Sequence, residues 1–366
     1  MIVACSSSRL TPKALLTPAV PDASKVEDAA PLDADLADSA PTMVDASSET
    51  EEPDDPMALH KETEHELLAL FTVLDFSPDQ YKTVRPDLFT NRVVGPVRQR
   101  MNQGNKTRAH HSIGKRACLR GLEGVVVQTD EQRQRCGGRE NMVPVYGKEA
   151  RGDPSLAKFC IDVFEFPNQP CELPFVWTAP THAQTMCNLQ GKRLCSDKEW
   201  NLACRGDPTG GADRLYAYGD SLDLSICTTH KARINKCDPR TLEGAWDTCG
   251  TDTEPSGSAP QCRSRFGVFD QHGNVAEVMT RREDDGKVVT QLKGSAFFYK
   301  DVSQLSNAEY LRAAQAHETL PPPRTDVETY PDHCNYDPRW HVEPIESAWH
   351  VNYHLGFRCC KTISPQ

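Results

Sequence analysis

The chain has 366 residues, of which 38% are hydrophobic and 25% charged, and its formal net charge at pH 7 is −11. This length allows one large domain or two ordinary ones. The excess of acidic residues argues against nucleic-acid phosphates as the main binding partner. The 15 cysteines include no two with two residues between them, so zinc sites of the paired CxxC type are excluded. Disulfides, and therefore an oxidising compartment, are the better interpretation.

The N-terminus resembles a bacterial lipobox, because Cys5 follows Ile2, Val3 and Ala4 and precedes serines. In such a motif the cysteine is lipidated after cleavage of a signal peptide. The basic and long apolar parts of a signal peptide are missing, so either the true start lies upstream or the match is accidental. We favour the lipoprotein interpretation for residues 1–5. It predicts an extracytoplasmic location, at the outer membrane or in the periplasm, with membrane contact only through the lipid.

Residues 6–56 are rich in Ala, Pro, Asp, Glu and Ser and have almost no aromatic side chains. Such a composition cannot bury enough apolar surface to offset its ordering entropy, so we expect a disordered acidic tether. Residues 57–140 are predicted to form a helical and irregular N-terminal region. Within 57–75 the apolar spacing indicates an amphipathic helix. His60 and His65 are five positions apart, on different helix faces, and we expect surface histidines rather than metal ligands.

From residue 141 the pattern becomes regular. The segments NMVPVYG and FCIDVFEF, residues 141–147 and 159–166, are typical of strands. Residues 180–190 predict a helix that stops at Gly191. A second helix is predicted to begin after Ser196 as N-cap and to continue through Cys204. Asp197 and Glu199 lie in its first turn, where their charges favour the helix dipole.

Residues 265–279 read RFGVFDQHGNVAEVM, an apolar run that breaks at Asp270 before a turn at Gly273 and Asn274. Asp270 and Glu277 flank the turn, so two carboxylates and the carbonyls between them would suit calcium. A solvated loop is the simpler interpretation of the pattern alone.

Four motifs in this order resemble the formylglycine-generating enzyme, or sulfatase-modifying factor, family: GKRLCSDKEWNLACRG, GVFDQHGNVAEVM, QLKGSAFF and GFRC, beginning at residues 191, 267, 291 and 356. The resemblance implies a domain over residues 141–366. Its expected fold is α+β: the formylglycine-generating variant of the C-type lectin-like fold, irregular and disulfide-rich.

The resemblance also implies particular residues. Two structural disulfides carry over as Cys187–Cys359 and Cys204–Cys334. A structural calcium ion carries over onto the side chains of Asp270 and Glu277 and the carbonyls of Gly273 and Val275. Sequence proximity, independently of the family, suggests Cys160–Cys171 and Cys227–Cys237. A local bridge between Cys118 and Cys136 is one interpretation, and the pairing of the following cysteines stays open: Cys118, Cys136, Cys195, Cys249, Cys262 and Cys360.

The catalytic residues of the family do not carry over. Its oxidase binds copper(I) through two cysteines after the glycine-serine element, and these positions are Phe298 and Ser303 here. Neither side chain supplies the soft thiolate that copper(I) requires, so we expect no copper. The two tryptophans that flank the calcium-loop glutamate in the family are replaced by Ala276 and Val278. The resemblance therefore supports the fold and argues against the oxidase chemistry.

Three functions follow from these patterns. The favoured one is a cell-envelope-anchored, non-catalytic binding or structural module, stabilised by calcium and disulfides, with an unknown protein or glycan partner and no nucleic acid. The first alternative is a divergent formylglycine-generating oxidase that acts on protein cysteine. The second is a lectin-like glycan receptor, supported only by fold analogy. Its candidate aromatic residues are Tyr299, Tyr330, Tyr336, Trp340 and Trp349.

Overall fold

The computed structural model describes residues 54–70, 101–229, 231, 241–298, 333–335, 337, 342–348 and 350–364. All of them belong to one compact unit, Glu52–Gln366. The predictions for Cys5, nearly all of the tether, Cys237, Ser303 and the five aromatic residues of the glycan hypothesis concern residues outside these ranges.

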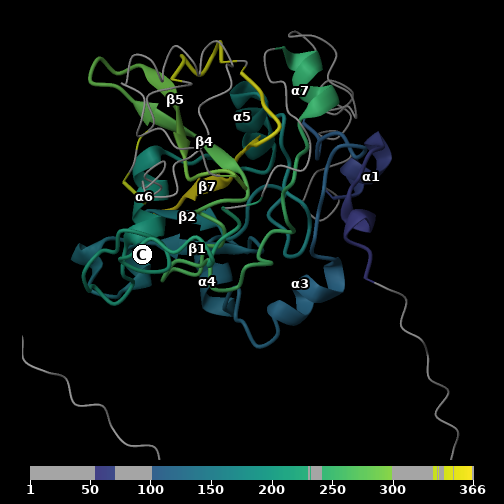
Figure 1. Ribbon diagram of the computed structural model, residues 1–366. Coiled ribbons are helices and arrows are strands. Elements are labelled where there is room, and N and C mark those ends of the chain that lie inside the picture. The colour runs from purple at the N-terminus through teal and green to yellow at the C-terminus, as the bar shows by residue number, and fades with distance from the viewer. Residues whose placement is uncertain are drawn as a thin grey trace, which may run out of the picture. The chain divides into compact units, whose positions relative to one another are not determined.

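The first sheet brings the two ends of the domain together. Its order is β1-β2-β7-β3, with neighbouring strands antiparallel. The strands are β1 (Met142–Val145), β2 (Phe159–Asp162), β7 (Cys359–Thr362) and β3 (Arg193–Leu194). The C-terminal strand β7 therefore lies between β2 and β3, at the centre of the ribbon in Figure 1.

The second sheet contains the end of the segment 265–279. Its order is β5-β4-β6, formed by β5 (Val288–Lys293), β4 (Ala276–Arg282) and β6 (Leu355–Gly356). Strands β4 and β5 form an antiparallel hairpin, whereas β6 pairs with β4 in parallel. A single bridge between Thr280 and Ser196 links β4 to the N-cap residue of helix α6 (Asp197–Arg205).

The two predicted helices of the domain are present. Helix α5 (Pro180–Leu189) ends one residue earlier than expected, and α6 (Asp197–Arg205) begins after Ser196. The Ser196 hydroxyl accepts from the Glu199 amide at 3.3 Å, and the Glu199 carboxylate accepts from the Ser196 amide at 2.9 Å. This reciprocal pairing is a capping box, which satisfies two otherwise unpaired backbone donors.

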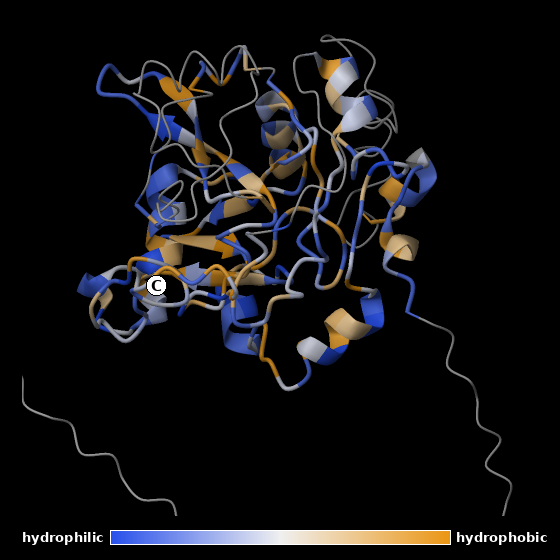
Figure 2. Cartoon of the chain, in the orientation of Figure 1, coloured by the Kyte–Doolittle hydropathy of each residue, from blue (hydrophilic) through white to orange (hydrophobic). Residues whose placement is uncertain are grey.

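Short helices make up the rest. They are α1 (Glu64–Ala69), α3 (Lys115–Gly121), α4 (Asp130–Arg135) and α7 (Leu242–Thr248), with the single turns η1 (Pro56–Leu59), η2 (Lys148–Ala150) and η3 (Pro154–Leu156). Helix α4 buries no residue. In Figure 2 it is mainly blue, while the central strands carry orange segments. The expected helix over 57–75 is, in its described part, η1 followed by α1.

Strand β2 is shorter than the alternation of residues 159–166 predicted. It ends at Asp162, because Asn168 folds the chain back and its side-chain oxygen accepts from the Phe164 amide at 3.1 Å. Phe164 and Phe166 are still buried. The alternation of apolar residues therefore predicted correctly which side chains are buried, but not how far the strand extends.

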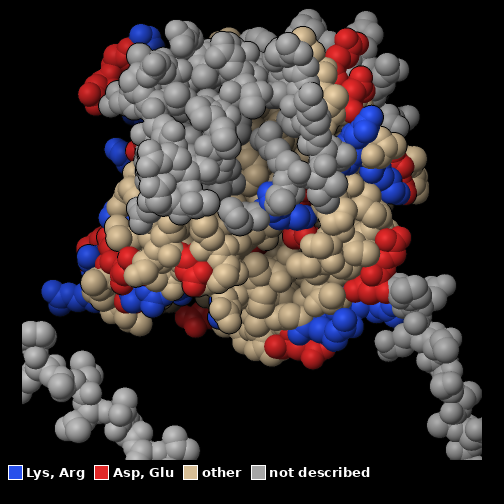
Figure 3. Space-filling view, viewed as in Figure 1, with Lys and Arg blue, Asp and Glu red and all other residues tan. Residues whose placement is uncertain are grey.

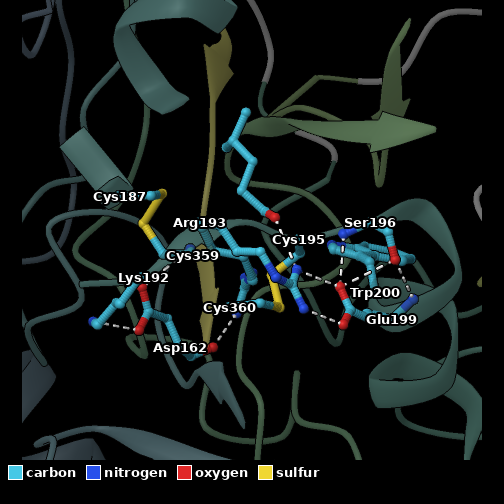
Figure 4. The surroundings of a disulfide bond; sticks show 12 residues. Asp162, Cys187, Lys192, Arg193, Cys195, Ser196, Glu199, Trp200, Cys359 and Cys360 are labelled. Atoms are coloured by element: carbon cyan, nitrogen blue, oxygen red, sulfur yellow. Dashed lines mark hydrogen bonds and ion pairs between the residues drawn. A yellow bond between two sulfur atoms is a disulfide. The ribbon is translucent and has the colours of Figure 1, made fainter. Parts of the chain in front are cut away.

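Both faces of β7 carry a disulfide. Cys359 bonds to Cys187 of α5, and Cys360 bonds to Cys195, the residue after β3 (Figure 4). Successive residues of a strand point to opposite faces, so the two adjacent cysteines reach different elements. Each bond closes more than 160 residues, with separations of 172 and 165, a loop size for which the entropy model gives an upper limit of about 5 kcal/mol.

Cys204 bonds to Cys334, so the structure contains both disulfides that the resemblance implied. The pairs suggested by sequence proximity are wrong. Cys160 bonds to Cys136, and Cys171 bonds to Cys118, which also excludes a Cys118–Cys136 bridge.

Cys227 bonds to Cys262 rather than to Cys237. Cys249 is disulfide-bonded as well. The physical reason for these differences is that a disulfide depends on Cα atoms lying about 4.4–6.8 Å apart in space. Strand β2 places Cys160 beside the end of α4, with a Cα–Cα distance of 5.8 Å to Cys136. Two disulfides thereby join residues 101–140 to the domain that follows.

Within the described ranges, no helix has the length and apolar character needed to cross a membrane. The face drawn in Figure 3 carries acidic and basic side chains in small mixed groups. The many disulfides indicate an oxidising, extracytoplasmic location.

Candidate functional site: a buried charged centre beside the altered oxidase positions

Arg358, from the motif GFRC, forms the centre of a buried ion-pair network. Its side chain is fully buried, as is the carboxylate of Glu277 at the start of β4. The Nε atom donates to both Glu277 oxygens, at 2.7 and 2.9 Å, and Nη2 also binds this carboxylate. The remaining N–H groups donate to the carbonyls of Asp162, Val163 and Phe269 at 2.8–3.2 Å. All five guanidinium N–H groups therefore have an acceptor.

Glu277 has a second donor. The indole N–H of Trp200, in α6, donates to its Oε2 at 2.8 Å. The ion pair thus connects β4, the end of β2, α6 and the residue before β7. Removing either charged partner would leave the other charge buried without compensation.

Two further carboxylates lie in the same interior. Glu165 accepts from the Val275 amide at 3.0 Å and from the side chains of Asn274 and Ser256 at 2.6 and 3.1 Å. Asp270 accepts from the Gly257 amide at 2.6 Å. Both acids are buried, with exposed fractions of 0% and 2%. The interpretation of residues 265–279 as a solvated loop is therefore wrong.

These acids influence one another. Burial, followed by the negative charges of Asp270 and Glu277, raises the pKa of Glu165 well above its ordinary value. Burial raises the pKa of Asp270 to about 7, with Arg358 opposing and Glu277 adding to the shift. With all groups ionised, three carboxylates face one guanidinium, which leaves two negative charges uncompensated in the interior. Such an excess is costly unless a proton or a cation neutralises it.

The turn itself depends on glycine. Gly273 has a φ of +80°, and a Cβ atom there would lie 2.2 Å from the Thr228 carbonyl oxygen. Asp270 and Asn274 also have positive φ, of 55° and 56°. Asp and Asn are the non-glycine residues that most readily tolerate this conformation. The residue types of the motif are therefore the ones its backbone requires.

The predicted calcium ligands come together in part. Asp270 and Glu277 belong to one electrostatic cluster, and the carbonyls of Gly273 and Val275 accept no hydrogen bond among the described residues. Oxygen donors and a charge excess of two suit a divalent hard cation. Both oxygens of Glu277, however, already accept hydrogen bonds from Arg358. The donor atoms are of the kind that calcium takes, but Glu277 is engaged by Arg358 and Trp200, which leaves Asp270 as the less engaged acid.

At one altered oxidase position the structure has an aromatic cluster. Phe298 is 8% exposed, stacks on Tyr353 with ring centroids 5.9 Å apart, and meets His354 edge-on at 5.2 Å. Ala276 and Val278, which replace the family's tryptophans, are buried in the same apolar cluster. The second oxidase position, Ser303, lies outside the described residues.

A histidine pair was missed by sequence reasoning. His60 is 2% exposed, and its Nδ1 lies 2.9 Å from Nε2 of His111, whose Nδ1 lies 2.6 Å from the Thr253 carbonyl oxygen. Burial lowers the pKa of His60 to about 3 and that of His111 to about 4. The expectation of a surface histidine is wrong for His60, while His65 is exposed. Because the two histidines are 51 residues apart in the chain, no local sequence pattern indicates that they meet.

Glu165 and Arg358 were missed for another reason. Glu165 was visible as an acid inside the apolar run FCIDVFEF, and Arg358 belongs to a motif that was interpreted only through its cysteine. An ionisable residue within an apolar run is a signal for a buried, paired charge.

The fold and this site define a disulfide-reinforced α+β domain with a buried charged centre. Residues 155–324 match the sequence model of the family described as sulfatase-modifying factor enzyme 1-like domain. The chain therefore contains a domain of this family.

A solved structure described as "Crystal Structure of CarF" is also similar, with 14% identity over 56% of this chain and 87% of that chain. Its TM-score is 0.32, too low to support an argument. A comparison with curated proteins found no match.

Proposed function

We propose that this protein is a non-catalytic binding or structural member of the sulfatase-modifying factor family, held in the cell envelope. The observation that carries the proposal is Phe298, which stands where the family oxidase has a copper-binding cysteine and packs against Tyr353 and His354. A phenyl ring has no atom that binds copper(I), and its burial in an aromatic cluster gives it a packing role instead.

The remaining cysteines support the same conclusion. Every cysteine of the described residues is in a disulfide. No thiol in this part of the chain is thus available either to bind copper(I) or to exchange with a substrate cysteine.

The decisive experiment incubates the purified protein with copper(I), oxygen and a peptide that contains the family's substrate cysteine. We expect no aldehyde product by mass spectrometry and no stoichiometric copper retained after gel filtration. A catalytically competent family enzyme, assayed in parallel, shows that the conditions support turnover. Formation of aldehyde by this protein at a rate above the copper-only background would reject the proposal.

Calcium is the second part of the proposal. The ion would be held by Asp270 and the carbonyls of Gly273 and Val275, with the Glu277 carboxylate shared between calcium and Arg358. Its charge would balance the two uncompensated carboxylates of the cluster and thereby stabilise the fold.

Removal of calcium tests this directly. A ligand at 100 times its dissociation constant stabilises the folded state by about 2.7 kcal/mol, so EDTA is expected to lower the melting temperature by several degrees. Asp270→Asn keeps the backbone preference and removes the charge, so this variant should lose the response. The matched control is Asp285→Asn in the exposed β4–β5 turn, which should respond as the original protein does. An unchanged melting temperature after verified metal removal would eliminate calcium while leaving the non-catalytic assignment intact.

The envelope location rests on the disulfides and on the lipobox-like residues around Cys5. Mass spectrometry of the N-terminal peptide from bacterial membranes should find Cys5 with a diacylglyceryl group. An unmodified Cys5 would refute the lipid anchor.

A further inference from the structure

A cavity of about 490 Å³ lies on a part of the domain that the proposed function does not use. It is bordered by α4, β1 and the segments around Asp153, Pro208 and Phe266. None of the residues of the buried charged centre or the aromatic cluster around Phe298 lines it. Its volume falls in the range of cavities that bind small molecules, about 300–1,000 Å³.

Two aromatic rings form part of its wall. Tyr146, which follows β1, meets Phe266 edge-on with ring centroids 5.3 Å apart and an interplanar angle of 88°. The Phe266 ring is nearly buried, and the Tyr146 ring is partly exposed. Proline rings of Pro144 and Pro208 complete this apolar part. The face of an aromatic ring carries partial negative charge and attracts cations.

The two arginines that border the cavity are already engaged. Arg135 donates to the carbonyls of Pro154, Ser155 and Ala157 at 2.7–3.2 Å. Arg265 is paired with the carboxylate of Asp207. These contacts fix both guanidinium groups to protein acceptors, so an anionic ligand would have to compete with them.

The acids that border the cavity are exposed and make no close contact with a cation, although the hydrogen bonds of Ser155 and then the charge of Arg135 lower the pKa of Asp153. Glu131 and Asp153 form no ion pair among the described residues. Asp153 accepts a hydrogen bond from the Ser155 amide at 2.9 Å, which leaves its charge in place. Burial and then the nearby carboxylates of Asp153, Glu131 and Asp207 raise the pKa of Tyr146. With Arg265 paired to Asp207, the carboxylates of Glu131 and Asp153 exceed the charge of Arg135 at the cavity by one formal negative charge.

We propose that this cavity binds a small organic cation, an alkylammonium group seated against the rings of Tyr146 and Phe266 and neutralised by Glu131 and Asp153. In this proposal the two arginines stay bound to their protein acceptors and take no part in binding the ligand. The ammonium could be that of a free quaternary amine or of a lysine side chain, because both present the same charge on an apolar stem.

The test compares two ligands of equal shape. Choline and its uncharged carbon isostere, 3,3-dimethylbutan-1-ol, are titrated into the full chain by calorimetry. Choline should bind at least about tenfold more tightly, the size of a cation–π contact combined with two carboxylates. N-acetyl-lysine amide is the third probe. Tighter binding of this amide than of choline would assign the ammonium to a lysine side chain, and the reverse order to a free amine.

Variants separate the two parts of the site. Asp153→Asn keeps the side-chain cap of η3 and removes the charge, and Tyr146→Leu removes the aromatic face. Each should weaken choline binding about tenfold. Glu123→Gln, an exposed acid outside the cavity, is the control and should change nothing. Thermal unfolding verifies that each variant is folded. Equal affinity for choline and its isostere, no binding of any probe, or equal effects of Asp153→Asn and Glu123→Gln would overturn the proposal.

Discussion

Strand β4 separates two interiors that are stabilised in opposite ways. Glu277 points to one face, where it binds Arg358 and Trp200, while Ala276 and Val278 point to the other and pack with Phe298 and its neighbours. This division follows from the alternation of side chains along a strand. The charged face depends on specific hydrogen bonds, and the aromatic face depends on apolar burial.

The comparison shows where this chain departs from its family. The residues that differ from the family motifs, Ala276, Val278 and Phe298, all lie in the aromatic cluster, whereas Glu277 is retained on the charged face. A buried ion pair cannot lose one partner without a large penalty, but apolar residues of suitable size can replace one another. The face of β4 that carries Glu277 thus matches the motif named by the resemblance, and the face that carries Ala276 and Val278 does not.

The largest expected effect is on the charged face. Arg358→Met should lower the free energy of unfolding by about 3–5 kcal/mol, because it leaves Glu277 buried without its cation. The control is Lys287→Met, which removes an exposed ion pair with Asp285 and should cost less than about 1 kcal/mol. Urea denaturation measures both. A loss below about 1 kcal/mol for Arg358→Met would mean that the two faces of β4 do not differ in this way.

A smaller loss is expected on the aromatic face. Phe298→Ala should cost about 3 kcal/mol, the lower end of the range for a buried phenylalanine, because part of the cluster can relax into the space. This cost should not change with salt, since the contacts are apolar. Unfolding curves at low and high ionic strength provide the check, and a cost that varies with salt would contradict the apolar description.

The smallest effect concerns pH. Asp270 has a raised pKa of about 7 in the folded state against an ordinary value of 3.8. The folded protein therefore holds a proton that the unfolded chain has lost, and stability falls as pH rises through 7. In metal-free protein the loss from this group between pH 6 and pH 8 is about 1.4 kcal/mol.

Asp270→Asn should reduce the dependence of the unfolding free energy on pH. The dependence that is left is the contribution of Glu165. Phe298→Ala, on the other face, should keep the full slope. Unfolding free energies of the two variants, measured at several pH values, test this. An identical pH dependence in Asp270→Asn and the original protein would show that Asp270 does not titrate in this range.

Local patterns and family motifs predicted several parts of the structure correctly. The N-cap at Ser196, helix α5 and the turn at Gly273 and Asn274 depend on residues within a few positions of one another. The disulfides Cys187–Cys359 and Cys204–Cys334 were implied by the family resemblance. By contrast, the pairs inferred from sequence proximity failed for Cys160, Cys171 and Cys227, since strand order and not chain distance brings cysteines together.

The sequence by itself determined the domain family, the oxidising environment and the residues of the turn between Asp270 and Glu277. These are properties of residue type, spacing and short-range geometry. Only the tertiary structure decided that the turn is buried and that the Glu277 carboxylate is bound by Arg358. It also decided that Glu165 lies close enough to Asp270 and Glu277 to be a third acid of the same buried cluster. The physical reason is that burial and electrostatic coupling depend on residues such as Asp162 and Arg358, nearly 200 positions apart, that the first sheet places side by side.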